Sequence, residues 1–112
     1  MHHARLPHHK LLAYAVAIQL LESVRKARIR DCHLRDQATR AAKSACLNAA
    51  EGAGRVTRAD KARAFAIARA EAGEAAAAVE IAIAAGEADA GALDAVLEHA
   101  DRFVAMMTAL IR

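Results

Sequence analysis

Apolar residues recur at three- and four-residue spacing along most of the chain, a pattern typical of helices that bury one side. A first helix is predicted at about residues 9–30. Its apolar positions form two adjacent rows, one of Leu11, Ala15, Ile18 and Leu21 and one of Leu12, Val16, Leu20 and Val24. Two adjacent rows predict a wide buried face. The last turns of this helix are expected to carry cations, which the carbonyl end of a helix favours.

The second helix is predicted at about residues 33–52. Its start is poorly defined because no Gly or Pro separates it from the first helix. Asp31 and Asp36 are both candidate starts, and one long helix that bends near Asp31 is the alternative. Its end is better marked, because Gly52 and Gly54 can adopt the left-handed conformation that ends helices.

A third helix is predicted at about residues 57–85, because Thr57 and Asp60 have the spacing of a capping box and Gly86 can end a helix. Gly73 in its interior either costs stability or permits a close backbone approach. The helix has two apolar rows, Phe65, Ala68, Ala72, Ala75, Val79 and Ala82 on one face, and Ile67, Ala70, Ala77, Ile81 and Ala84 on another.

The fourth helix, at about residues 89–111, has one regular apolar stripe, formed by Leu93, Val96, Leu97, Ala100, Phe103, Val104, Met107, Leu110 and Ile111. Short links between successive helices predict an all-α, antiparallel, up-down-up-down four-helix bundle over residues 9–112. Residues 1–8 are expected to be a flexible terminal segment.

Composition agrees with this prediction. The chain has 112 residues, the size of one domain, and it is rich in Ala with only five Gly and one Pro. The most apolar run, residues 75–85, is too short to span a membrane and contains Glu80. No secretory pattern precedes Cys32 and Cys46, so we expect a cytoplasmic protein with two free thiols.

Apolar surface predicts self-association, and the distribution of charge is compatible with it. The first and third helices carry more apolar surface than one four-helix core can bury. The apolar stripe of the fourth helix is expected to be buried fully in one contact. Residues 1–70 contain 14 Lys and Arg against 5 Asp and Glu, and residues 71–112 contain 2 against 8. This separation, +9 against −6, suggests a polyanionic partner or charge-complementary self-association. Oppositely charged helices lying side by side in one bundle are the alternative.

Catalytic and metal-binding patterns are not found. Cys32 and His33 are adjacent, so they point in different directions and cannot easily share a proton. His99 lacks the Glu three positions earlier that di-iron bundles use, and the Gly52–Gly54 stretch is no P-loop. Asp94, Glu98 and Asp101 are interpreted as a solvated acidic face. We therefore predict no enzymatic activity, no cofactor, no metal centre and no small-molecule substrate. The terminal histidines, which could bind a metal ion adventitiously, are His2, His3, His8 and His9.

Basic residues are the remaining candidate site. The candidates for nucleic-acid binding are Arg25, Lys26, Arg28, Arg30, Arg35, Arg40, Lys43, Arg55 and Arg58. Guanidinium groups suit phosphate oxygens and would give salt-dependent affinity for RNA or DNA without base readout. No aromatic residue accompanies this set, which disfavours sequence-specific recognition of single strands. A solvated helix surface is the alternative.

The stretch Cys46–Arg55, together with Phe65–Arg69 and Glu74, resembles the four-helix-bundle family encoded in intervening sequences of bacterial 23S ribosomal RNA genes. The resemblance extends over about residues 11–110. The positions that match the family motif are Asn48, Glu51, Gly52, Gly54 and Arg55, and Gln37 and Arg40 fit polar positions upstream. The family's Gly-Ser pair in the third helix is Ala70-Glu71 here.

This resemblance implies a ring-like pentamer, and the family includes accessory proteins of diversity-generating retroelements that bind reverse transcriptase and nucleic acid. A nucleic-acid-processing protein is thus a further candidate partner. The motif residues also have structural interpretations: Asn48 can cap carbonyls at the end of the second helix, and Glu51 can pair with Arg55 or Arg58. A protein-interaction adaptor or assembly scaffold with no nucleic-acid role is the alternative function.

Overall fold

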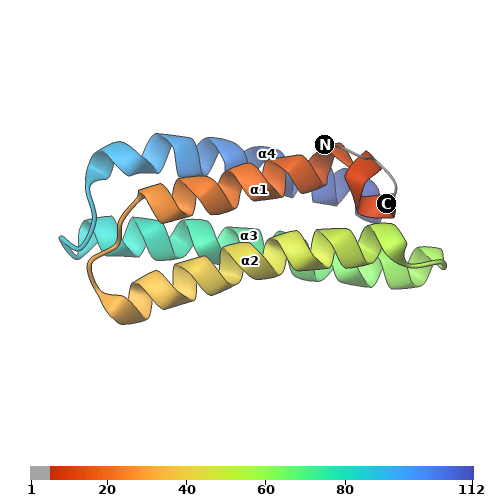
Figure 1. The fold of residues 1–112 in the computed structure, drawn as a ribbon, viewed down its shortest axis with the longest axis horizontal. Helices are drawn as coiled ribbons and strands as arrows, with labels where there is room; N and C mark the ends of the chain where they lie inside the picture. Colours follow the sequence, from red (N-terminus) through yellow and green to blue (C-terminus); the bar gives the residue numbers. More distant parts are fainter. Residues whose placement is uncertain (1–5) are drawn as a thin grey trace.

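The computed structural model describes residues 6–112, and the described part is all-α with no strand. Its helices are η1 (Pro7–Lys10), α1 (Leu12–Lys26), α2 (Cys32–Gly54), α3 (Arg58–Ala84), η2 (Ala90–Ala92) and α4 (Leu93–Ile111). Figure 1 shows the four α-helices lying side by side along the long axis. The α1–α2 and α3–α4 loops lie at one end, and the α2–α3 loop and η1 lie at the other.

The first helix is shorter than the predicted 9–30 at both ends. Pro7 opens a separate 3-10 turn before α1, and Arg28 has a φ of 50°, which is incompatible with a continuing right-handed helix. The sequence suggested that Arg28 and Arg30 belong to the last turns of the helix. They lie instead in the loop that follows α1. Within the terminal segment that was expected to be flexible, Pro7 and His8 belong to η1, and the rings of His8 and Tyr14 lie 4.8 Å apart. Residues 1–5, which include His2 and His3, lie outside the described part.

The second helix begins at Cys32, directly after Asp31, one of its two candidate starts. The carboxylate of Asp31 accepts a hydrogen bond of 2.9 Å from the backbone N–H of Leu34, which is the N-cap interaction of α2. A single long helix through Asp31 is thus ruled out. The Thr57 hydroxyl likewise accepts a bond from the N–H of Asp60 and caps α3, as predicted. Gly86, with a φ of 77°, follows the end of α3.

Alanine forms much of the core. The most extensive helix contact joins α2 and α3. The fully buried alanines of these two helices are Ala38, Ala42, Ala45, Ala49, Ala68, Ala72, Ala75 and Ala82. Larger side chains from α1, α3 and α4 fill the rest of the interior; the fully buried ones are Val16, Leu20, Val79, Val96, Phe103 and Met107. Small side chains on α2 and α3 permit close approach of these two helices, and bulky ones hold α1 and α4 against them.

The outer faces retain apolar surface. On α3 the first predicted row is buried, whereas the second is largely exposed, with Ile67 at 45% and Ile81 at 55% exposure. The prediction for α4 was wrong, because Leu97 and Leu110 remain exposed beside a buried seam. Helix α4 therefore also retains exposed apolar surface. Within residues 6–112 no helix combines the length and apolar character needed to cross a membrane.

Candidate nucleic-acid interface

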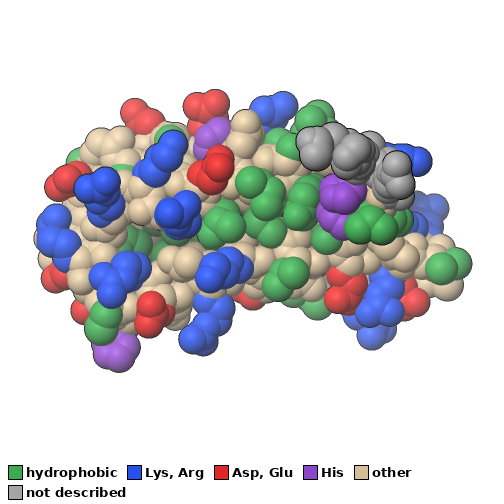
Figure 2. All heavy atoms as spheres, viewed as in Figure 1, with side chains coloured by type: hydrophobic (Ala, Val, Ile, Leu, Met, Phe, Trp, Pro, Cys, Tyr) green, Lys and Arg blue, Asp and Glu red, His purple; other side chains and the backbone are tan. Residues whose placement is uncertain are grey.

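A shallow groove lies where the end of α1 meets the start of α2. Its basic lining consists of Arg25, Arg28, Arg35 and Lys43, all exposed, and its volume is about 370 Å³. Buried Ile29 anchors the connecting loop, which brings cations from two helices and a loop to the same groove. Figure 2 shows Lys and Arg side chains spread over this end of the molecule and along α2.

The positive charge of this groove is little compensated. Asp36 is the one carboxylate in its lining. Among residues 6–112 the ion pairs are Arg30–Asp89 and Arg55–Glu51, so none of the four groove cations is paired within this part of the chain. Among the four side chains, that of Arg35 alone makes a hydrogen bond within residues 6–112, of 3.3 Å to the carbonyl of Ile29. Uncompensated, exposed cations in a concave surface attract polyanions.

Two more of the predicted candidates lie close by but do not line this groove. Lys26 is exposed and lines a neighbouring pocket between α1 and α4. Arg40 is exposed on α2, one turn before Ser44 and two turns before Leu47 on the same side of the helix. Their charges still contribute to the positive potential at this end.

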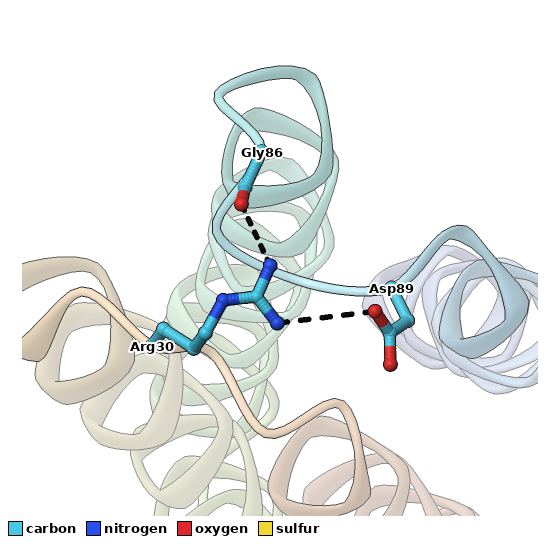
Figure 3. A network of polar contacts seen from close by, with 3 residues as sticks. All are labelled: Arg30, Gly86 and Asp89. Atoms are coloured by element: carbon cyan, nitrogen blue, oxygen red, sulfur yellow. Dashed lines mark hydrogen bonds and ion pairs between the residues drawn. The ribbon is translucent and has the colours of Figure 1, made fainter.

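Arg30 has a structural role. Its guanidinium donates a hydrogen bond of 2.7 Å to the carbonyl of Gly86, and it lies 3.8 Å from the carboxylate of Asp89 (Figure 3). Its backbone N–H also donates to the carbonyl of Glu87 at 2.7 Å. Arg30 therefore joins the α1–α2 loop to the α3–α4 loop.

Arg55 and Arg58 lie at the opposite end of the molecule. Helix α2 has 23 residues and hence a length of about 34 Å, which separates them from Arg28 and Arg30. Arg55 donates a 2.8 Å hydrogen bond to Glu51, and this partner raises the pKa of Arg55 above its usual value. The pairing with Glu51 was one of the two predicted. The nine candidates thus divide between two ends and do not form one patch on the chain.

The motif glycines act differently from the prediction. Neither Gly52 nor Gly54 has a positive φ, and α2 continues through both. A Cβ on Gly52 would lie 2.5 Å from Cε1 of Phe65, whereas one on Gly54 would meet nothing within 4 Å. Gly52 is therefore required for the packing of the buried Phe65 ring. The close backbone approach considered for Gly73 is not found, since a Cβ there would also meet no atom within 4 Å.

The end of α2 is capped by a residue that the sequence did not single out for this role. The ammonium group of Lys61 donates to the carbonyls of Gly52 and Ala53, at 3.3 and 3.0 Å. The expectation that Asn48 caps this end was wrong, because its amide donates back to the carbonyl and hydroxyl of Ser44. A signal for Lys61 exists in retrospect: it follows the N-cap Thr57 by one helical turn, where a long cation on α3 can reach the adjacent end of α2.

Cys32 is exposed and Cys46 is buried, and both are free. Burial raises the pKa of the Cys46 thiol to about 11, so Cys46 packs as a small apolar residue. Among residues 6–112 there is no cluster of three or more His, Cys, Asp or Glu side chains that could hold a metal ion.

The fold and the groove define a small helical-bundle protein with an exposed basic end. A family model described as 23S rRNA-intervening sequence protein matches residues 9–109, and the chain belongs to this family. The match covers all four α-helices except the end of α4. No curated protein matches the chain.

Proposed function

We propose that this chain is a non-enzymatic, oligomeric protein of the cytoplasm that associates with RNA or DNA through the α1–α2 groove. The observation that supports this function is the set of four exposed cations in one concave surface, unpaired within the described residues. Such a surface suits the sugar-phosphate backbone, which carries regularly spaced charge whatever the base sequence. Sequence-independent, salt-sensitive binding is the expected behaviour.

The salt dependence can be estimated from the number of cations. If each of the four neutralises one phosphate of a duplex, the slope of log K against log salt is about −3.6 per subunit. Affinity then falls roughly 150-fold between 50 and 200 mM salt. Fluorescence anisotropy with a labelled 20-base-pair duplex, titrated at several salt concentrations, measures this slope.

A matched pair of triple variants tests the location of the site. The first removes Arg25, Arg28 and Lys43 by substitution with alanine, and it should reduce the slope to about −1. The control removes three exposed cations outside the groove, Lys10, Arg58 and Arg63, each by substitution with alanine. The proposal is wrong if the wild type does not bind at micromolar concentration in 50 mM salt, or if both triple variants lose affinity equally.

We also propose that copies of the chain associate through two different surfaces. One is a groove along α4 that is apolar at Leu97 and Val104 and acidic at Asp94, Glu98 and Asp101. The other is the outer side of α2, where Leu47 is 71% exposed and Arg40 lies two turns earlier. An exposed leucine beside a cation complements an apolar groove with acidic edges.

A contact between two unlike surfaces produces a ring when its rotation closes, and the resemblance to the family sets the expected number of subunits at five. Leu47→Glu places a charge against the acidic groove and should reduce the mass measured by light scattering to that of a monomer. Arg40→Glu should weaken assembly, and adding Asp101→Arg should restore it. A monomeric wild type at tens of micromolar would refute self-association and favour the adaptor alternative, in which a basic helix of another protein occupies the α4 groove.

A further inference from the structure

A second pocket adjoins the basic groove, on the other side of the α1–α2 loop. It lies between α1 and α4 and has a volume of about 620 Å³. Small residues create it: Ser23 and Ala27 line it from α1 and the loop, and Gly91, Ala92 and Ala95 line it from η2 and α4. Its volume falls within the range of roughly 300–1,000 Å³ that is typical of ligand sites.

The polar lining of this pocket is varied. Lys26 and Arg28 supply positive charge, and Glu22 and Asp89 supply hydrogen-bond acceptors. His99 contributes an imidazole ring, and its Nδ1 is buried with no hydrogen-bond partner among the described residues. A ligand that combines an anionic group, hydrogen-bond donors and a flat ring fits this set of groups, because each group then has a complementary partner.

Arg28 connects the pocket to the basic groove, since it lines both. Its left-handed backbone places it at the turn of the loop, between the α2 side and the α4 side. A phosphate bound by Arg28 could therefore be one of the backbone phosphates that lie in the groove and could also carry the nucleoside that lies in the pocket. This shared residue favours a nucleotide that is part of a strand over an unrelated small molecule.

We propose that the α1–α4 pocket receives one unstacked nucleotide of a single-stranded RNA or DNA whose backbone lies in the α1–α2 groove. This proposal rests on the proposed function and specifies its substrate. Lys26 and Arg28 hold the flanking phosphate, and the base lies beside the His99 ring. Glu22 accepts a hydrogen bond from a base amino group or a ribose hydroxyl. A duplex must first unstack a base to use the pocket, so single strands bind more tightly.

The test compares a labelled 12-nucleotide single strand with a duplex of the same length, by anisotropy at one salt concentration. We expect the wild type to prefer the single strand about tenfold or more. Ala95→Leu fills the pocket and should abolish this preference while duplex binding is retained. Ala105→Leu, on an exposed position of α4 outside the pocket, is the control and should retain the preference. Circular dichroism verifies that both variants are folded.

The outcomes separate the two proposals. If strand and duplex bind equally with a steep salt slope, or if Ala95→Leu keeps the preference, the pocket proposal is wrong and the basic groove stands. If neither ligand binds at 50 mM salt, both proposals fail. Adenosine monophosphate is the competitor that identifies the source of the nucleotide. If adenosine monophosphate competes only at millimolar concentration, the pocket binds a nucleotide that is part of a strand, as proposed. If the free nucleotide binds more tightly than the strand, the proposal is overturned.

Discussion

Replacing Gly52 by alanine inserts a methyl group into the space that the Phe65 ring occupies. The new Cβ would lie 2.5, 2.6 and 3.0 Å from Cε1, Cδ1 and Cζ of that ring. Real Cβ atoms do not approach other atoms this closely, so the ring or the backbone must move. Because Phe65 is only 4% exposed, the ring cannot swing into solvent without losing its burial. Overpacking of this kind costs about 1–3 kcal/mol.

Alanine also favours the helix over glycine, by up to about 1 kcal/mol, which offsets part of the overpacking cost. We therefore expect Gly52→Ala to lower the free energy of unfolding by about 1–2 kcal/mol. Urea denaturation followed by circular dichroism measures this change, at one fixed protein concentration because association affects stability.

Gly54→Ala is the matched control, since a Cβ at Gly54 meets nothing within 4 Å and its φ is not positive. It should be neutral or slightly stabilising. Phe65→Leu shortens the contacting side chain, so the double variant with Gly52→Ala should be more stable than additivity of the single variants predicts. If Gly52→Ala is as stable as Gly54→Ala, the steric explanation of this motif glycine is wrong.

Three further predictions concern stability and titration. Lys61→Met leaves two carbonyls at the end of α2 without their donor and should cost about 1 kcal/mol in urea denaturation. Arg63→Ala, two residues later on α3 and exposed, should change little. Arg30→Ala removes the side-chain bond to the carbonyl of Gly86 and should also cost about 1 kcal/mol. Asp89→Asn should cost under about 0.5 kcal/mol, because that carboxylate is almost fully solvated. Equal effects would contradict the assigned role of the carbonyl bond. Burial raises the pKa of the Cys46 thiol from 9.0 to about 11, so the unfolded chain releases this proton first and stability falls as pH rises from 9 to 11. Cys46→Ala should remove this component of the pH dependence, and an unchanged dependence would show that the thiol does not contribute to it.

Hydrophobic spacing predicted four helices because each one must bury a continuous side against the others. The cap of α3 was also predictable, since the Thr57 hydroxyl and the N–H of Asp60 interact locally. Loop conformation was not predictable in the same way. The left-handed Arg28 has no sequence signal, because arginine does not prefer that region. The two residues after it are held by distant parts of the chain, since Ile29 is buried and Arg30 bonds to Gly86.

The candidate site shows the same division between local and long-range information. Exposure of all nine predicted cations follows from their charge, whatever the fold. Their division between two ends depends on the path of α2, and the α1–α4 pocket depends on which small residues meet across two helices that are distant in sequence. His99 could be excluded as a di-iron ligand from spacing alone, but its place in a pocket beside Arg28 required the tertiary structure.

The alanine contact between α2 and α3 limits how this chain can change. Ala42 and Ala72 are fully buried, so an added carbon at either position must be accommodated by a shift of the packed helices. The outer sides of the bundle have no such restriction. Substitutions that create new partners are therefore tolerated on the surface while the α2–α3 pair stays fixed, and proteins built this way can differ widely in what they bind without altering their shape.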